Sequence, residues 1–232
     1  MAEPVIQFSD VHLTLGSGAS QVHVLRGIDL EIEAGRSVGV VGPSGSGKST
    51  LLMVMAGLEQ IDSGKVVLAG QDFSKLDEDG LAAFRGRNIG IVFQSFHLIP
   101  NMTALENVAV PLELAGMNNA FDRAREELKA VGLGERLDHY PGQMSGGEQQ
   151  RVAIARAMAP GPKIIIADEP TGNLDEKTGD QISDLLFRKQ KEANTTLVLV
   201  THDPSLAEQC DTTVRVRLGE IVADDQAAME PA

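Results

Sequence analysis

The sequence has little aromatic character and a single cysteine. Of its 232 residues, one is tyrosine, none is tryptophan, and aromatic side chains make up 3%. The single cysteine, Cys210, excludes an internal disulfide and is typical of a reducing cytosol, and we expect it to be a small buried apolar side chain. No cysteine and histidine cluster with zinc-ligand spacing is present. Disulfides and structural zinc are therefore excluded as sources of stability.

Long apolar runs and a secretory leader are also missing. No uninterrupted apolar stretch approaches the roughly 20 residues that a membrane-spanning helix needs. The chain starts with the acidic segment Met1-Ala2-Glu3-Pro4, where a signal peptide would carry basic residues before an apolar stretch. We therefore expect neither a secretory signal nor a helix that crosses the bilayer.

Basic residues are scarce as well. There are 20 lysines and arginines against 33 acidic residues, which gives a net charge of −13. Nucleic-acid affinity comes mostly from neutralising phosphates, so this charge argues against binding through a broad basic surface. It argues equally against direct adhesion to an anionic membrane face. If the protein works at a membrane, we expect another protein to hold it there. The apolar fraction of 42% is sufficient for a core.

The strongest motif is a glycine-rich loop at 42–50, which matches G-x-x-x-x-G-K-[ST]. An apolar run of strand character precedes it at 37–41, and a good helix former without proline follows at 51–56. Its glycines permit positive φ and let backbone N–H groups approach phosphate oxygens, and the helix end adds its dipole. Lys48 would reach the β- and γ-phosphates, and the Ser49 hydroxyl would ligate Mg²⁺. The alternative is a surface Gly/Ser turn that caps an ordinary helix, and the Lys-Ser-Thr run together with both flanks argues against it. The candidate nucleotide-binding residues are Gly42, Pro43, Ser44, Gly45, Ser46, Gly47, Lys48, Ser49 and Thr50.

Strands alternate with helices along most of the chain, which predicts an α/β fold with a mostly parallel core sheet. We expect strands at 5–8, 11–15, 28–32, 37–41, 65–69, 89–93, 163–167 and 196–200, and a terminal hairpin at 214–222. Helices are expected after the glycine-rich loop and at 76–87, from 104, and at 122–131, 146–158, 179–191 and 206–209. The region 95–159 is helical in character and separates the two parts of the core. The acidic, small-residue segment 224–232 is expected to be a mobile tail.

Polar side chains follow three of the expected core strands. Asp168 and Glu169 end one of them, and ligands in open α/β sheets lie beyond the carboxyl ends of strands. Asp168 suits Mg²⁺, directly or through water, and Glu169 could polarise the attacking water. Gln94 could contact Mg²⁺ and that water, and His202 could contact the γ-phosphate. For His202 a structural hydrogen bond is the usual alternative.

A second anion-binding helix end is expected at 145–158. Ser145 can cap this helix, and Gly146 and Gly147 leave its first N–H groups bare. The simpler explanation is a well-capped helix. One phosphate chain already has its glycine-rich loop, however, so a second cradle needs an explanation.

These motifs, in this order, resemble the ATP-binding subunits of ABC transporters over nearly the whole chain. The resemblance makes Gln94 the Q-loop glutamine, His202 the switch histidine, and Asp168 and Glu169 the Walker B acids. It makes the signature 145–149, with Glu148, and the D-loop 172–175, with Asp175, parts of the nucleotide site. It implies that 1–223 form one ABC ATP-binding domain. Its parts are an antiparallel β layer at about 4–35 and 64–70, a P-loop core at about 36–94 and 160–210, and a helical subdomain at about 95–159.

The resemblance also implies how such a chain works. Two copies pack head to tail around two ATP molecules, each held by the phosphate loop of one chain and the signature of the other. Glu169, His202, Gln94 and Lys48 would be the catalytic residues, and Ser49, Gln94 and Asp168 would bind Mg²⁺. The segments 93–100, 103–108 and 168–175 are similar to lipoprotein-releasing and macrolide-exporter ATPases, and the chain is similar to an uncharacterised bacterial relative of the former. A membrane permease with a periplasmic domain is implied, which places the protein at the cytoplasmic face of the bacterial inner membrane.

The sequence departs from the family pattern in three places. Leu15 stands where an aromatic residue usually stacks on adenine, Met144 replaces the commoner leucine that begins the signature, and Glu148 replaces its glutamine. Loss of a ring weakens base stacking by about 1 kcal/mol. Two alternatives to transport stay open: an ATPase that regulates cell-wall hydrolysis at division through a membrane partner, and a soluble ABC ATPase outside transport. The acidic charge and the lack of a long insertion oppose the second.

Overall fold

The computed structural model describes residues 4–222, and they form two compact units. The first unit contains the chain up to Leu81 and from Thr196 onward, and the second contains 82–195. The acidic tail expected at 224–232 lies outside the described residues. Across residues 4–222, none of the helices is both long enough and apolar enough to cross a membrane.

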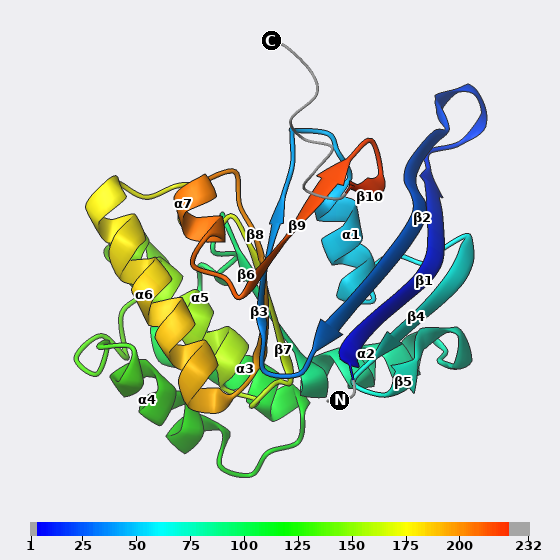
Figure 1. The fold of residues 1–232 in the computed structure, drawn as a ribbon. Coiled ribbons are helices and arrows are strands. Elements are labelled where there is room, and N and C mark those ends of the chain that lie inside the picture. Colours follow the sequence, from blue (N-terminus) through cyan, green and yellow to red (C-terminus); the bar gives the residue numbers. More distant parts are fainter. Residues whose placement is uncertain (1–3, 223–232) are drawn as a thin grey trace. The chain divides into compact units, whose positions relative to one another are not determined.

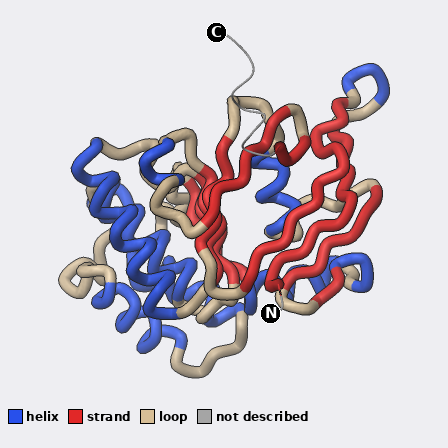
Figure 2. Tube along the Cα trace, in the orientation of Figure 1, coloured by secondary structure: helices blue, strands red, loops and turns tan. Residues whose placement is uncertain are grey.

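An antiparallel sheet forms one part of the first unit (Figures 1 and 2). Within the described residues its strand order is β2-β1-β4-β5, made of β1 (Pro4–Leu15), β2 (Val22–Glu33), β4 (Ser63–Leu68) and β5 (Gln71–Asp72). The pairing Phe8↔Leu30 places two apolar side chains opposite each other in the core. This confirms the expected antiparallel layer.

The separate strands expected at 5–8 and 11–15 are wrong, because β1 is one strand with an irregularity between them. The register shifts between Phe8 and Val11, and Asp10 has a φ of 48°. The Asp29 carboxylate accepts the Asp10 N–H at 2.9 Å, which satisfies a backbone donor that the bulge removes from the ladder. A bulge at polar residues resembles a turn in sequence, which explains the error.

Parallel strands form the other part of the first unit. The buried strand β3 (Ser37–Val41) pairs in parallel with both β8 (Thr196–Val200) and β9 (Thr212–Arg217). Strand β9 then turns back into β10 (Glu220–Val222), which is the expected terminal hairpin. The helices of this unit are α1 (Lys48–Met55) and the short α7 (Pro204–Ala207), and η1 (Gly18–Ser20) and η2 (Phe73–Lys75) are 3₁₀ turns. Helix α2 (Glu78–Asn88) begins in this unit and ends in the second.

The second unit combines two parallel strands with a group of helices (Figure 1). Strand β6 (Ile89–Phe93) pairs with β7 (Ile164–Asp168) in unbroken register, and both are largely buried. The helices are α3 (Ala104–Leu114), α4 (Ala120–Ala130), α5 (Gly146–Met158) and α6 (Glu176–Ala193), with a 3₁₀ turn, η3 (Pro141–Gln143), before α5. Helix α5 packs against β6 and the other three helices, so Val152, Ala153, Ile154 and Ala155 are fully buried. This packing makes α5 the centre of the unit.

Candidate functional site

The glycine-rich loop joins β3 to α1, as its sequence predicts. Gly42, Gly45 and Gly47 have φ values of 154°, 76° and 105°, a range in which other residues are strained. The backbone carbonyl of Val216 occupies the space that a side chain on residue 42 would need. The positive φ values at Gly42, Gly45 and Gly47 therefore require glycine. At Gly42 the Val216 carbonyl also leaves no space for a side chain.

Lys48 begins α1 and reaches back over the loop. Its Nζ donates hydrogen bonds to the carbonyl oxygens of Gly42 at 2.8 Å and Pro43 at 2.9 Å. An ammonium group has three donors, so one is left for a ligand. The Ser46 hydroxyl is buried inside the loop and finds no hydrogen-bond partner among the described residues. A loop with an orphaned hydroxyl and a held ammonium fits an anion that supplies acceptors.

His202 lies beside the same loop. The parallel pairing of Val40 with Val200 brings the ends of β3 and β8 to one edge, and Thr201 N–H donates to the Val40 carbonyl at 3.3 Å. A cavity of about 440 Å³ is lined by Gly42, Pro43 and His202 together with residues of α7 and β9. The side chain that the sequence places after β8 therefore reaches the P-loop, and its role toward a γ-phosphate stays a prediction.

Gln94, Asp168 and Glu169 lie together in the second unit. Phe93 pairs with Asp168, so Gln94 directly follows the end of one strand while Asp168 ends its neighbour. Glu169 has a φ of 44°, which is strained for a non-glycine residue and common at functional sites. Its backbone carbonyl accepts the Gly172 N–H at 3.0 Å, which closes a tight turn. The two successive carboxylates are therefore attached to different backbone conformations, an extended strand at Asp168 and a left-handed residue at Glu169.

Asn173 holds Gln94 through two hydrogen bonds, a contact that sequence analysis missed. The Gln94 Nε2 donates to Asn173 Oδ1 at 3.1 Å, and Asn173 Nδ2 donates to the Gln94 carbonyl at 3.0 Å. The Gln94 Oε1, the atom that a metal would take, is not used in this pair. Asn173 was assigned to the D-loop by resemblance alone, and nothing local in the sequence signals this pairing.

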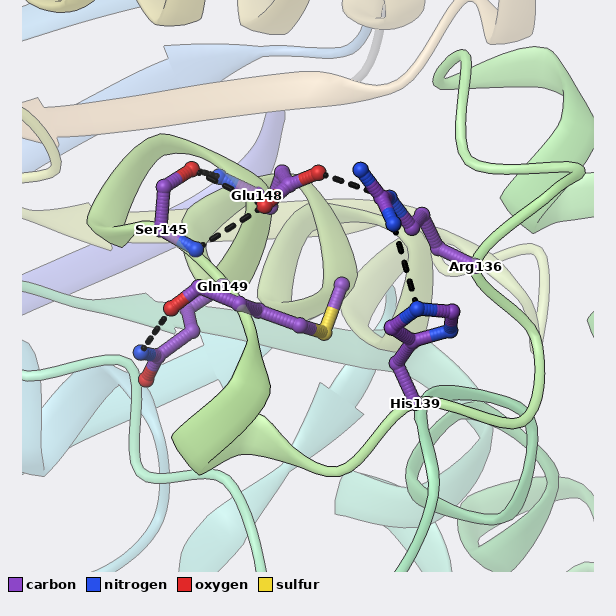
Figure 3. Close-up of polar contacts among 6 residues, drawn as sticks. Arg136, His139, Ser145, Glu148 and Gln149 are labelled. Atoms are coloured by element: carbon purple, nitrogen blue, oxygen red, sulfur yellow. Dashed lines mark hydrogen bonds and ion pairs between the residues drawn. The ribbon is translucent and has the colours of Figure 1, made fainter.

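The signature segment begins α5 with a capping box (Figure 3). Ser145 Oγ accepts the Glu148 N–H at 3.2 Å, and the Glu148 carboxylate accepts the Ser145 N–H at 2.9 Å. The hydrogen bond from the Ser145 backbone is the main cause that lowers the pKa of Glu148. The Glu148 N–H is thus satisfied within the chain, so the bare donors that the sequence predicts narrow to those of Gly146 and Gly147. A side chain on Gly147 would meet the Thr178 Cγ2 at 2.6 Å.

Two further side chains of α5 hold neighbouring segments in place. The Arg156 guanidinium donates to the carbonyl oxygens of His97 at 2.6 Å and Phe96 at 2.9 Å. Both of these residues have positive φ, 47° and 59°. The buried Gln150 amide donates to the Pro170 carbonyl at 2.7 Å. The signature helix is therefore bonded to the chain that follows both β6 and β7.

Two other predicted positions have a plain structural role. The Asp175 carboxylate caps α6 by accepting the Thr178 N–H at 3.1 Å. Hydrogen bonding by the Thr178 side chain, followed by this backbone bond, lowers the pKa of Asp175. Contact with a nucleotide stays a prediction for this residue. Leu15 ends β1 half-buried and pairs with Val22, which is 58% exposed. Phe8, the only aromatic side chain before Leu15, is fully in the core, so it cannot replace the missing ring.

Fold and motifs together define a P-loop ATPase of the ABC type. The family model described as ABC transporter matches residues 25–172, more than half of the chain, and the chain belongs to this family. The predicted family, fold class and ATPase class are thereby confirmed.

Several known proteins are similar to this chain over most of its length. YbbA of Escherichia coli (strain K12), an uncharacterized ABC transporter ATP-binding protein, is 48% identical over 95% of this chain and 97% of its own. LolD of Geobacter metallireducens, a lipoprotein-releasing system ATP-binding protein, is 49% identical over 95% and 99%. MacB of Marinobacter nauticus, a macrolide export ATP-binding/permease protein, is 46% identical over 99% of this chain but 36% of its own.

Solved structures agree with the sequence relatives. The dimeric structure of MJ0796, a bacterial ABC transporter cassette, is 41% identical with a TM-score of 0.85. It covers 94% of this chain and 97% of the other. A second MJ0796 structure, a dimeric post-hydrolysis state bound to ADP and Pi, is 40% identical with the same TM-score and coverage.

Proposed function

We propose that the chain binds ATP at its P-loop and forms a dimer in which the signature of a second copy completes each site. The observation that carries this proposal is the presence of two anion cradles in one chain. One is the P-loop with its positive-φ glycines, and the other is the capped start of α5 with the N–H groups of Gly146 and Gly147. A head-to-tail dimer uses both cradles twice, and a symmetric homodimer then has two equivalent sites. The dimeric MJ0796 structure bound to ADP and Pi supports this arrangement.

The P-loop residues supply the electrostatics of phosphoryl transfer. Lys48 and the loop N–H groups would neutralise charge on the β- and γ-phosphates, and His202 would secure the γ-phosphate. The two carbonyl bonds that hold Lys48 restrict its Nζ to the mouth of the loop. Positioning of this kind supports catalysis because the donors need not reorganise as charge develops.

Mg²⁺ is the metal that the donor set suits. Ser49 offers a hydroxyl, Gln94 an amide oxygen and Asp168 a carboxylate, all hard oxygen ligands of the type that Mg²⁺ takes beside substrate phosphates. The described residues contain no group of three or more His, Cys, Asp or Glu that could form an all-protein metal cage. A bound Mg²⁺ would polarise the phosphates and neutralise developing charge. The hydrogen bond from Gln94 Nε2 to Asn173 Oδ1 supports this role, since it engages the amide nitrogen of Gln94 and not its oxygen.

Glu169 is the proposed partner of the attacking water. Its carboxylate would accept a hydrogen bond from the water and then a proton, while the water oxygen bonds to the γ-phosphorus and the bond from that phosphorus to the ADP oxygen breaks. The products are ADP and phosphate. The strained turn at Glu169 supports the assignment, since strain of this kind persists where the surrounding structure holds a side chain in a required direction.

A membrane permease is the proposed partner that uses the ATPase cycle. LolD carries the name of a lipoprotein-releasing system and MacB that of a macrolide export protein, and both names belong to those relatives. By analogy we place this chain at the cytoplasmic face of the bacterial inner membrane, bound to a permease with a periplasmic domain. The segment 96–100 is the proposed contact, and a crosslink from Leu98 to a co-expressed permease would test it.

Two substitutions test the shared ATPase site. Glu169→Gln should keep ATP binding and lose turnover by about 10²- to 10⁴-fold, the usual range for a general base. Ser145→Arg should block the ATP-dependent dimer yet leave ATP binding to the P-loop intact. Ser9→Arg, an equal change at an exposed position of β1, is the matched control. Wild-type turnover in the first variant, or an ATP-bound dimer in the second, would contradict the proposal.

A further inference from the structure

Arg136 forms an ion pair with the glutamate of the signature (Figure 3). Its Nε donates to Glu148 Oε1 at 3.1 Å, while the other carboxylate oxygen accepts the Ser145 N–H at 2.9 Å. One carboxylate thus joins two segments, the loop before η3 and the start of α5. The side chain of Arg136 is 48% exposed and that of Glu148 27% exposed, so the pair lies at the surface beside the helix end.

The backbone around Arg136 is fixed before the side chain reaches Glu148. Arg136 N–H donates to the Leu133 carbonyl and His139 N–H to the Arg136 carbonyl, so two successive turns define the loop. The His139 carbonyl in turn accepts the first N–H of α3, from Ala104, at 2.8 Å. The second arm of the guanidinium, Nη1, lies 3.1 Å from His139 Nε2. Because arginine only donates, His139 Nε2 is the acceptor in this contact. Two of the three guanidinium nitrogens, Nε and Nη1, are therefore engaged, which fixes the direction of the side chain.

Glu148 needs such a partner because of where it stands. The hydrogen bond from the Ser145 backbone holds its pKa below the ordinary value, so the carboxylate is ionised at neutral pH. An ionised carboxylate near a helix N-terminus stabilises the helix, but it also repels a phosphate that binds at the same end. The Gly146 and Gly147 N–H groups stand within the same first turn.

We propose that Arg136 is a positioning residue of the shared ATP site, which offsets the charge of Glu148 and keeps its carboxylate turned into the capping box. This inference rests on the proposed function, because the phosphate in question belongs to the ATP of a second copy. With Arg136 in place, Glu148 caps Ser145 without opposing that phosphate. Without Arg136, the first turn of α5 presents an unpaired negative charge to the incoming nucleotide.

Loss of the ion pair should weaken dimerisation modestly at each site, and the fold-changes of the two sites of a dimer multiply. A half-exposed ion pair changes an equilibrium by about two- to fivefold. Two sites form in each dimerisation, so loss of Arg136 should weaken the ATP-dependent dimer by roughly four- to twenty-five-fold. Binding of ATP to the P-loop of a single chain should not change, since the pair lies in the other unit.

A double-mutant cycle in the Glu169→Gln background tests the inference. The dimer dissociation constant is measured by sedimentation with ATP and Mg²⁺ for Arg136→Met, Glu148→Gln and the double variant. Arg136→Met keeps the aliphatic stem and removes the charge. Arg125→Met is the matched control, since Arg125 pairs with the Asp122 carboxylate at the same 3.1 Å and is 40% exposed on α4. Thermal unfolding of each variant reports folding separately.

The charge argument predicts a specific pattern. Arg136→Met should weaken the dimer by the stated factor and Arg125→Met should not. In the Glu148→Gln background, where no carboxylate remains to offset, Arg136→Met should change the dimer less than twofold. An equal loss in both backgrounds would show that Arg136 only scaffolds the loop and would overturn the inference, as would no loss at all. If the Glu169→Gln parent itself forms no ATP-dependent dimer, the proposed function fails instead.

Discussion

Replacing Arg156 by alanine should increase local opening of the segment after β6, whereas the free energy of global unfolding should fall only slightly. The guanidinium bonds the carbonyl oxygens of Phe96 and His97, and both residues have left-handed φ values. Burial lowers the pKa of Arg156, and the carbonyl oxygens of Phe96 and His97 accept its hydrogen bonds. These two hydrogen bonds, called the clamp below, therefore stabilise the segment against the backbone strain at Phe96 and His97.

The two contributions oppose each other in the free energy of unfolding. Hydrogen bonds from a charged donor contribute about 1.5 kcal/mol each at the low end, suited to partly exposed carbonyls, so two contribute about 3 kcal/mol. Left-handed conformations of two non-glycine residues cost roughly 1 kcal/mol each, and this strain is released when the clamp is lost. The net destabilisation is about 1 kcal/mol, or a fall in melting temperature of about 2–4 °C for a chain of this size.

Hydrogen exchange and calorimetry together measure both parts. Exchange of the Phe96 and His97 amides, which donate to the Phe93 and Ser95 carbonyls, should accelerate in Arg156→Ala. Exchange within α5 should not change, and Arg125→Ala should leave both regions as in the parent. A fall in melting temperature well above 10 °C would refute the balance of strain and bonding. Unchanged exchange at Phe96 and His97 would refute the clamp itself.

Three further predictions concern the loop, the amide pair and acid stability. Gly42→Ala should weaken ATP binding in a fluorescence titration by roughly ten- to hundredfold, since it is strained and blocked. A side chain on residue 45 would meet no atom within 4 Å, so Gly45→Ala should weaken ATP binding only roughly fivefold. Equal losses of ATP affinity in the two variants would contradict the steric argument. Asn173→Ala should lower phosphate release on the order of tenfold by freeing Gln94, and a wild-type rate would exclude this role. Because the folded-state pKa of Glu148 is lowered, its contribution to stability is complete above the ordinary glutamate pKa and is lost as pH falls through the lower value. Glu148→Gln should therefore melt with a shallower acid dependence, and an identical pH profile would count against the capping contribution.

Local sequence was sufficient to predict the bounds of an element wherever the residues of that element carry a clear start and end signal. The strand before the P-loop, the strand at 196–200 and the helix at 146–158 have the predicted bounds, because an apolar run or a cap with a glycine signal defines them. Helix α6 is longer than expected at both ends, since Asp175 caps it and Asn194 ends it in a left-handed conformation. The short strand β5 was missed, because two residues carry no periodic signal.

Long-range contacts were beyond the sequence for the opposite reason. Gln94 and Asn173, which bond each other, lie 79 residues apart in the sequence. Arg156 donates to carbonyl groups about 60 residues before it. Main-chain carbonyls are present in every residue, so no pattern marks the one that a distant arginine will bind. Nothing in the sequence marks Arg136 as the partner of Glu148. The capping box itself is predictable, because residues 145–148 have the S-x-x-E spacing.

The residues alone thus predicted the chemistry of this protein, since a phosphate loop, paired acids after a strand and a serine-capped helix that begins with two glycines each need a residue type at a short spacing. Tertiary structure decided how these groups are held. Packing against Val216 makes Gly42 obligatory, the register of β6 and β7 brings Gln94 beside Asp168, and Arg136 forms an ion pair with Glu148, one of the three departures from the family pattern. Spacing along a chain selects reactive groups, whereas strain, register and charge balance depend on neighbours that only folding supplies.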